Sequence, residues 1–318
     1  MSQFEFIIQN RKDNNIYEIS QLISYIKYTD SLNNGCSKLD FNYVDDGSID
    51  IPNGSVIRFT YNKVGIFYGY VFKNERGKGR EVSVIAYDQL RYLKAKDIVV
   101  VQGGDLSDLV TKACNYFKLR KGMVTSTQYT LPVSVHDNKT WLDIIYECID
   151  NILIKTSRKY CLRDEFGLLS LRNLEDLQLD LILGDGSLCY DFKYSKSIDE
   201  DTYNLIKLVK KNEQTGKVDL YIAQDSSSFG KWGLLQFYSE GDKDSTDQSL
   251  KDKADSLLKL LNREVESLKV SCLGDTSVRA GNSIIVNVGD LGLHKRLIVN
   301  SVSHSFVPLH TMEVELCI

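Results

Sequence analysis

The chain has 318 residues, of which 42% are hydrophobic and 26% charged, and its formal net charge is −4. This length suits two or three domains with ordinary cores. The 39 basic residues are outnumbered by 43 acidic residues and form no dense block, which argues against direct, specific binding of nucleic acid.

The first residues, the apolar runs and the cysteines together predict a soluble protein of a reducing compartment. Met1–Phe6 lacks the basic segment and apolar core of a signal peptide. No apolar run approaches the roughly 20 residues that cross a bilayer, so we expect no membrane insertion. The seven cysteines form no CxxC pair and no Cys/His metal pattern. We therefore expect assembly in the cytoplasm, without a metal or another cofactor.

Residues 4–88 are typical of consecutive short strands. Turn chemistry separates them, as in Asn33-Asn34-Gly35 and Pro52-Asn53-Gly54. Many short strands at near-regular spacing indicate a sandwich or barrel, and a helix start at Tyr87–Leu93 ends the series. We predict an N-terminal β-barrel domain over residues 1–97, with strands at Phe4–Ile8, Leu22–Tyr28, Leu39–Val44, Val56–Tyr61, Ile66–Phe72 and Glu81–Tyr87.

The middle of the chain, residues 98–180, changes to helical spacing. Asp105 is a possible cap for a helix that carries Leu106, Leu109, Val110, Ala113 and Phe117 on one face. Thr140–Asp143 resembles a capping box before a second apolar stripe. Lys159–Arg163 and Leu168–Arg172 then indicate a hairpin. We predict a small α/β module.

Residues 181–318 return to strands, interrupted by one amphipathic helix over residues 246–268. Ser245–Gln248 reads as its capping box, and its apolar stripe runs from Leu250 to Leu268. The architecture that we predict is mainly β with α+β parts: two β-barrel or sandwich domains flank the α/β module, and one helix lies on the second barrel. The strands are expected at Leu188–Tyr194, Thr202–Lys210, Lys217–Gln224, Leu234–Tyr238, Lys269–Leu273, Ser283–Val288, Arg296–Ser303 and Thr311–Leu316.

The last two strands are expected to close the second domain as a hairpin. Val299 and Val302 lie in a strand-like run, and Pro308 marks a break. Met312, Val314 and Leu316 then alternate with polar residues in period two. Such pairing covers an edge whose backbone groups would otherwise be open to aggregation.

No set of residues carries a strong catalytic or metal-binding signal. His304 and His310 flank the hairpin connection near Glu313 and Glu315, but a third ligand at suitable spacing and an HExxH helix are lacking, so a structural role is preferred. Ser256–Lys259 matches SxxK only in mid-helix, and Gly77–Arg80 fails the phosphate-loop spacing. A pair of carboxylates acting across space stays open. We predict no catalytic, cofactor-binding or metal residues, and no enzyme.

Four stretches, in order, resemble a known family. The closing run from Val299 to Leu316 is similar to the V-x-x-V-x-H-x-F…H-x-M-x-V-x-L ending of baseplate hub proteins from contractile phage tails, although many of those carry Gly where this chain has Leu309. Val84–Leu93, Ser197–Lys207 and Val278–Val286 agree as well. The stretches resemble the PBSX-type hub family of Gram-positive phages, defective prophages and R-type bacteriocins.

This resemblance implies two tail-tube-like barrels per chain and assembly as a homotrimer. The trimer would adapt a hexameric tail tube to a trimeric central spike, with tail tube, spike and other baseplate or wedge proteins as partners. The alternative is a tail-associated module that binds or degrades peptidoglycan through the middle segment. A weaker third reading is a relative of secretion-system spikes.

Overall fold

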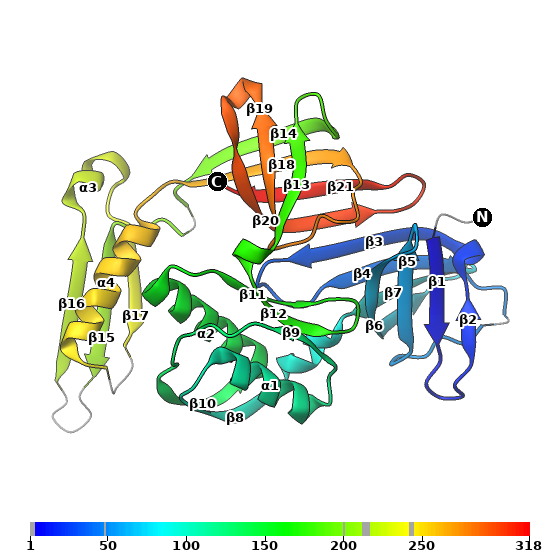
Figure 1. The fold of residues 1–318 in the computed structure, drawn as a ribbon, viewed down its shortest axis with the longest axis horizontal. Coiled ribbons are helices and arrows are strands. Elements are labelled where there is room, and N and C mark those ends of the chain that lie inside the picture. Colours follow the sequence, from blue (N-terminus) through cyan, green and yellow to red (C-terminus); the bar gives the residue numbers. More distant parts are fainter. Residues whose placement is uncertain (1–3, 48, 200, 212–216, 242–244) are drawn as a thin grey trace. The chain divides into compact units, whose positions relative to one another are not determined.

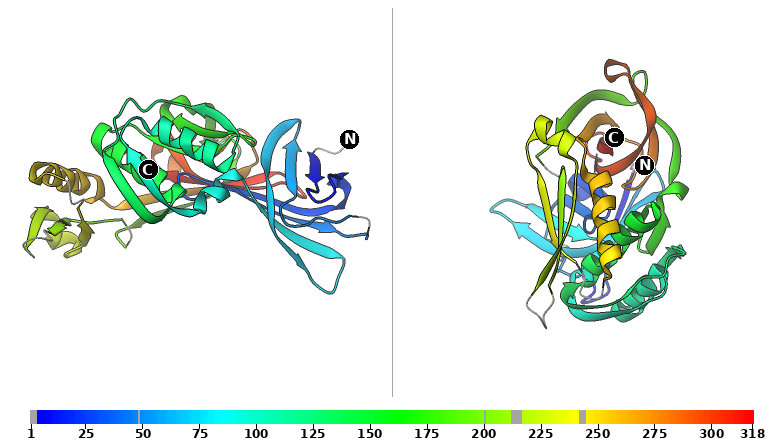
Figure 2. Two further views of the ribbon diagram at one scale, coloured as in Figure 1. Left: turned by 90° about the horizontal axis from the view of Figure 1, so that it is seen from below. Right: turned by 90° about the vertical axis from the view of Figure 1, so that its left-hand side faces the viewer.

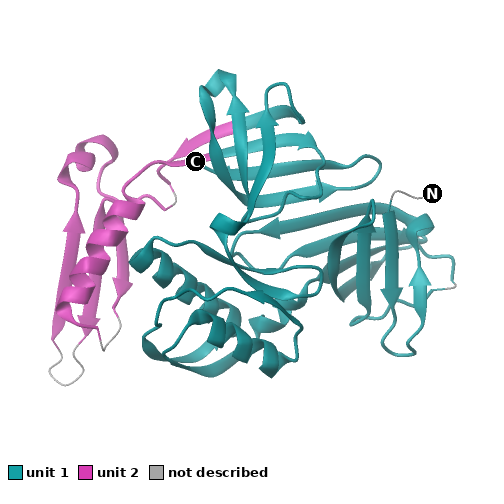
Figure 3. Cartoon of the chain, viewed as in Figure 1, with its two compact units in different colours: residues 1–193, 268–317 teal, residues 194–267, 318 magenta. Residues whose placement is uncertain are grey.

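The structure, a computed structural model, describes residues 4–47, 49–199, 201–211, 217–241 and 245–318. The chain divides into two compact units (Figure 3): unit 1 comprises residues 1–193 and 268–317, and unit 2 comprises residues 194–267 with residue 318. Strands predominate, in several sheets, so the predicted class is confirmed. In the described ranges no sheet closes into a barrel. The domain boundaries at 97/98 and 180/181 stay predictions.

The N-terminal strands form one antiparallel half of a large sheet in unit 1 (Figure 1). Their apolar residues alternate along each strand and enclose an aromatic core, in which the rings of Phe6 and Phe41 lie 4.6 Å apart. The predicted strands are confirmed in this region, and the short β2 adds to them. In sheet order, the strands are β3 (Ile23–Ser31), β4 (Lys38–Val44), β7 (Glu81–Tyr87), β6 (Val64–Arg76), β5 (Val56–Tyr61), β1 (Phe4–Gln9) and β2 (Ile16–Glu18).

The C-terminal strands form the other half, including the predicted closing hairpin. β20 (Leu293–Ser305) and β21 (Thr311–Cys317) pair antiparallel across a connection with a cis Val307–Pro308 bond. β13 pairs parallel with β19, which in turn pairs with β20. The remaining strands of this half are β13 (Gln178–Gly184), β14 (Cys189–Ser197), β18 (Val265–Leu273) and β19 (Ser283–Val288).

The two halves become one 13-stranded sheet because β20 also pairs with β3. Along one edge of β20, residues 293–298 pair with β19 and residues 301–305 pair with β3. The opposite edge pairs with β21. Figure 1 shows β3 and β20 side by side. One edge of β20 therefore pairs with a strand from each half of the sheet.

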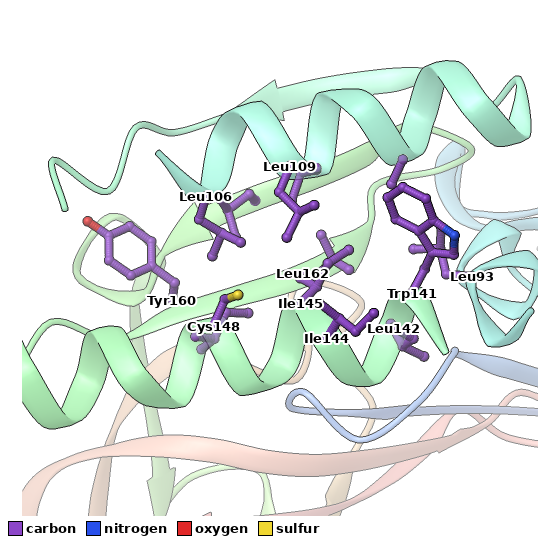
Figure 4. Close-up of a cluster of buried hydrophobic side chains, with 14 of the residues drawn as sticks. Leu93, Leu106, Leu109, Trp141, Leu142, Ile144, Ile145, Cys148, Tyr160 and Leu162 are labelled. Atoms are coloured by element: carbon purple, nitrogen blue, oxygen red, sulfur yellow. The ribbon is translucent and has the colours of Figure 1, made fainter. Parts of the chain in front are cut away.

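The α/β module is confirmed. Asp105 caps α1 (Leu106–Phe117) in a capping box with Asp108, and Thr140 caps α2 (Trp141–Thr156). Figure 4 shows Leu106 and Leu109 of α1 facing Ile145 and Cys148 of α2 across a buried cluster. The other elements are η2 (Gln89–Lys94), β8 (Lys96–Gln102), β9 (Lys121–Val124), β10 (Val133–Thr140), β11 (Tyr160–Asp164), β12 (Leu169–Asn173) and η3 (Leu174–Asp176).

Unit 2 has its own three-stranded sheet, in the order β16–β15–β17. The predicted amphipathic helix α4 (Asp247–Leu261) packs on β15 and β16 (Figure 2), which were expected to belong to the second barrel and instead form this separate sheet with β17. Thr246, not Ser245, is its cap, and the helix ends at Leu261 because Val265–Leu273 forms β18. The other elements of unit 2 are β15 (Leu205–Lys211), β16 (Val218–Gln224), α3 (Ser226–Trp232) and β17 (Gln236–Glu240).

The end of β13 requires glycine. Gly184 has φ +141°, and a Cβ there would lie 1.7 Å from the carbonyl oxygen of Asn287 on the paired strand β19. Both the backbone conformation and the close approach of the strands exclude a side chain.

We expect Gly184→Ala to lower the free energy of unfolding by about 3 kcal/mol or more, because the added methyl group must push β13 and β19 apart. Urea denaturation of the purified protein measures this. Gly77→Ala is the matched control, since nothing lies within 4 Å of its added Cβ. Equal stability of the two variants would contradict the prediction.

Candidate functional site

A group of charged and polar side chains lies where three parts of unit 1 meet, and we call it the junction cluster. β3 contributes one carboxylate, the loop between β18 and β19 contributes an arginine, and the α/β module contributes two more carboxylates and an amide. The members of the junction cluster are Asp30, Ser37, Asp88, Gln89, Asp164 and Arg279.

Arg279 connects all three parts. Its Nε donates to Asp30 Oδ2 at 3.0 Å, and its Nη1 donates to the carbonyl oxygen of Asp164 at 2.7 Å. The guanidinium also lies 5.9 Å from the centre of the Tyr28 ring. Burial by itself lowers the pKa of Arg279, but the nearby carboxylates, Asp30 foremost, raise it above the ordinary arginine value. The side chain therefore stays charged as it joins the N-terminal strands, the C-terminal loop and the α/β module.

The carboxyl groups of the α/β module are held by local hydrogen bonds. Asp88 accepts from the backbone N–H groups of Ser37 and Leu90, at 2.8 and 2.9 Å. Asp164 accepts from Gln89 Nε2 at 2.7 Å and from Gly167 N–H at 2.6 Å. Burial raises the pKa of both carboxyl groups. Arg279 alone cannot neutralise Asp30, Asp88 and Asp164. The hydrogen bonds described above stabilise Asp88 and Asp164.

His304 and His310 contact each other beside this cluster. His304 Nε2 donates to the carbonyl oxygen of Val278 at 2.9 Å, which leaves its Nδ1 to accept from His310 Nε2 at 3.1 Å. The His310 ring stacks on Phe306, with ring centres 4.4 Å apart. Burial lowers the pKa of His304 to about 4 and also lowers the pKa of His310. The pair is therefore neutral near pH 7 and packs as part of the core.

The other candidates from the sequence lie apart from this pair. Glu313 and Glu315 alternate with Met312 on β21, so they face the opposite side of the sheet from the residues buried with His304. Ser256 donates to the carbonyl oxygen of Asp252 within α4. Gly77–Arg80 lies at the turn between β6 and β7. In the described ranges, no group of three or more His, Cys, Asp or Glu side chains is arranged to hold a metal ion.

Two apolar surfaces are exposed, one in each unit. In unit 1 the ribbon of β8 and β10 buries Val99 and Val101 and exposes the alternate residues, a set that we call the ribbon face: Ile98, Val100, Val133 and Val135. Val133 and Val135 are 71% and 68% exposed. Contiguous apolar groups of this kind commonly mark interaction surfaces.

In unit 2 the side of the sheet that does not carry α4 is also apolar. Its exposed residues, which we call the insert face, are Val218, Leu220, Ile222 and Tyr238. They flank Lys207 of β15, which lies opposite both Ile222 and Tyr238. Alternation on β16 produces this face, because Tyr221 and Ala223 point to the side that is buried.

Sequence reasoning did not assign the junction cluster or the two apolar faces. Two stretches that carry the family resemblance nevertheless contain members of the junction cluster. Asp88 and Gln89 lie in Val84–Leu93, and Arg279 lies in Val278–Val286. In the sequence, both stretches stand out only by their resemblance to a family. The structure brings them together with the closing run, in which His304 lies.

No described helix combines the length and the apolar character that a membrane span requires.

Comparison with known proteins gives consistent matches over most of the chain. A family model described as YQBQ-like matches residues 26–317. The phage-like element PBSX protein XkdQ of Bacillus subtilis (strain 168) is 26% identical over 85% of this chain and 83% of its own length, which confirms the resemblance to the PBSX-type family.

Two solved structures share the fold. A tail protein from Neisseria meningitidis MC58 covers 100% of this chain and 97% of its own, with a TM-score of 0.73 and 11% identity. The E. coli c3393 protein, described as a type VI secretion system component with structural similarity to T4 tail proteins gp27 and gp5, covers 93% of this chain and 73% of its own, with a TM-score of 0.58 and 10% identity.

We expect Arg279→Met to lower the free energy of unfolding by about 3–5 kcal/mol, because it leaves Asp30 buried without its cation. Chemical denaturation measures the loss. Asp30→Asn in the same chain should restore part of it, since the uncompensated charge is then gone. Lys38→Met, which removes an ion pair of a 39% exposed lysine with Asp40, is the control and should cost at most about 1 kcal/mol. An equal loss in both single variants would contradict this role for Arg279.

The neutral histidine pair predicts a pH dependence of stability. The folded pKa of His304 is about 4 and lies below the ordinary value of 6.5, so the unfolded chain binds more protons as the pH falls through this window. Stability should therefore fall by about 2 kcal/mol between pH 7 and pH 5 through His304. Denaturation midpoints at several pH values measure the slope. His304→Gln should flatten it, whereas His294→Gln, at an exposed site, should leave it unchanged; a slope unaffected by His304→Gln would refute the assignment.

Proposed function

The chain belongs to the YQBQ-like family, and from this premise we propose that it is a structural baseplate hub, which joins a hexameric tail tube to a trimeric central spike in a contractile phage-tail-like particle. The names of its relatives support this proposal, because they include a PBSX phage-like element protein and phage tail proteins. Its role is geometric and non-enzymatic. The particle is a phage tail, a defective prophage or an R-type bacteriocin.

The observation that carries the proposal is the two-part sheet of unit 1. One chain holds an N-terminal and a C-terminal set of strands, both largely antiparallel and joined through β3 and β20. Three copies of such a chain contribute six sets of strands. A homotrimer is therefore threefold in its chains and close to sixfold in its sheets, which is what a contact between a sixfold tube and a threefold spike requires.

Exposed apolar residues supply surfaces for such an assembly. The ribbon face presents four aliphatic side chains to solvent, and the C-terminal sheet half ends at β14, where Tyr190 is 65% exposed. Burying apolar side chains and extending sheets across subunits are the usual sources of affinity in permanent assemblies. Tail tube, spike and wedge proteins are the partners that we propose.

We expect the purified protein to form a homotrimer with three times the 36.2 kDa mass of the chain. Light scattering over a range of concentrations measures the mass, and electron microscopy should show a ring with three chains and six similar lobes. Mixed with its tail tube protein, the ring should cap the end of the tube.

A protein that stays monomeric at every concentration and also fails to bind the tube would contradict the hub proposal. A zymogram with purified cell wall tests the alternative role in parallel. Lysis of the wall would contradict the non-enzymatic role.

A further inference from the structure

Two cysteines of unit 1 lie opposite each other on neighbouring strands. The carbonyl oxygen of Leu188 on the approach to β14 accepts from the backbone N–H of Leu273 on β18, at 2.9 Å. In an antiparallel ladder this bond pairs residues 188 and 273, so the next pair is Cys189 and Cys272. Their Sγ atoms are 2.7 Å apart. The strands β14 and β18 are neighbours in the sheet order.

This position suits a disulfide bond. Cys189 and Cys272 form the pair next to the hydrogen-bonded one, and such pairs hold their Cα atoms about 4.5 Å apart. That separation lies within the range that disulfides span, and a covalent S–S bond is about 2.05 Å long. The two sulfur atoms therefore need to approach by only about 0.7 Å from their 2.7 Å separation. Little movement of the backbone is required.

The two thiols differ in access to solvent. Cys272 is fully buried, whereas Cys189 is partly exposed. Cys189 lines a cavity of about 230 Å³ together with Asp185, Tyr190 and Asp191. A small molecule in this cavity would meet the sulfur of Cys189 and not that of Cys272. The cavity also carries carboxylates, so it favours a cationic molecule over an anionic one.

From this geometry we infer that Cys189 and Cys272 are a thiol pair that a small cationic disulfide, entering the cavity beside Cys189, converts to a cross-strand disulfide. The inference does not depend on the hub role, because it concerns the single chain. It adds a covalent modification site to a protein whose composition had indicated free thiols.

The reaction proceeds by two exchanges. The Cys189 thiolate attacks one sulfur of the small disulfide, whose S–S bond breaks, and the released thiolate takes up a proton. Cys272 then loses its proton and attacks Cys189 Sγ, which breaks the mixed disulfide and releases the second small thiol. Two protein thiols are oxidised to one disulfide, and the small disulfide is reduced to two thiols.

The order of the two exchanges follows from the surroundings of the sulfurs. The hydrogen bond from the Cys272 thiol lowers the pKa of Cys189, whereas the same bond and burial raise the pKa of Cys272. The thiolate is the attacking species, so the accessible sulfur is also the one that ionises first.

The disulfide bond would link the two strands along which the chain enters and leaves unit 2. The chain leaves unit 1 along β14 and returns along β18, so a link between residues 189 and 272 closes a covalent loop around residues 194–267. Unfolding of that segment would then no longer separate β14 from β18 at this point.

Treatment of the full-length protein with cystamine, a dicationic disulfide, tests the inference. After reaction, blocking with N-ethylmaleimide and digestion with trypsin, mass spectrometry should find residues 173–193 linked to residues 270–279, which carry one cysteine each. The link should form about tenfold faster with cystamine than with anionic glutathione disulfide. Dithiothreitol should remove it.

Two single substitutions separate the steps. Cys272→Ser should trap one cysteamine on Cys189, because the second exchange is lost, whereas Cys189→Ser should prevent both the adduct and the link. Cys317→Ser, which changes an exposed cysteine, is the control and should form the link as the unaltered chain does. Cystamine treatment that yields no linked peptide, or an adduct on Cys272 in place of Cys189, would overturn the inference. A rate with glutathione disulfide equal to that with cystamine would overturn the cavity as the route of access.

Discussion

The ion pair between Arg279 and Asp30 is the interaction on which the architecture of unit 1 depends. The partners are 249 positions apart in sequence, and their side chains are 15% and 7% exposed. Removing charges from water is costly, and a buried pair recovers that cost only when its geometry and its remaining hydrogen bonds are satisfied. Here Ser37 Oγ donates a further hydrogen bond to Asp30, and Arg279 donates one to the carbonyl oxygen of Asp164. The α/β module is therefore positioned by the same arginine that joins the two sets of strands.

The shared edge of β20 complements this charged contact with backbone hydrogen bonds. Since β19 and β3 occupy successive parts of one edge, the C-terminal strands cannot shift along β3 without losing pairs on both sides. The buried ion pair and these backbone hydrogen bonds add less to stability than apolar burial does, but together they restrict the two sets of strands to one register. The hub role that we propose would require such a fixed relation between the two sets of strands.

The local elements could be predicted from sequence wherever periodicity and caps agreed. The helix behind Asp105, the hairpin from Lys159 to Arg172 and the closing hairpin all had such signals. The separate sheet beneath α4 could not be predicted, since an amphipathic stripe shows that a helix covers something and not which strands pair beneath it. The parallel pairing of β13 with β19 likewise leaves no local pattern. Arg279 was not identified because a single arginine in a polar loop has the same composition whether it is buried or exposed.

Unit 2 is connected to unit 1 through two neighbouring strands, β14 and β18. Residues 194–267 leave and rejoin unit 1 on neighbouring antiparallel strands, and Ser195 and Ser267 are hydrogen-bonded across those strands at 2.8 Å. A two-residue turn could replace the whole segment and leave an ordinary hairpin. A change in the length of this segment would therefore leave the pairing of the sheet of unit 1 in place.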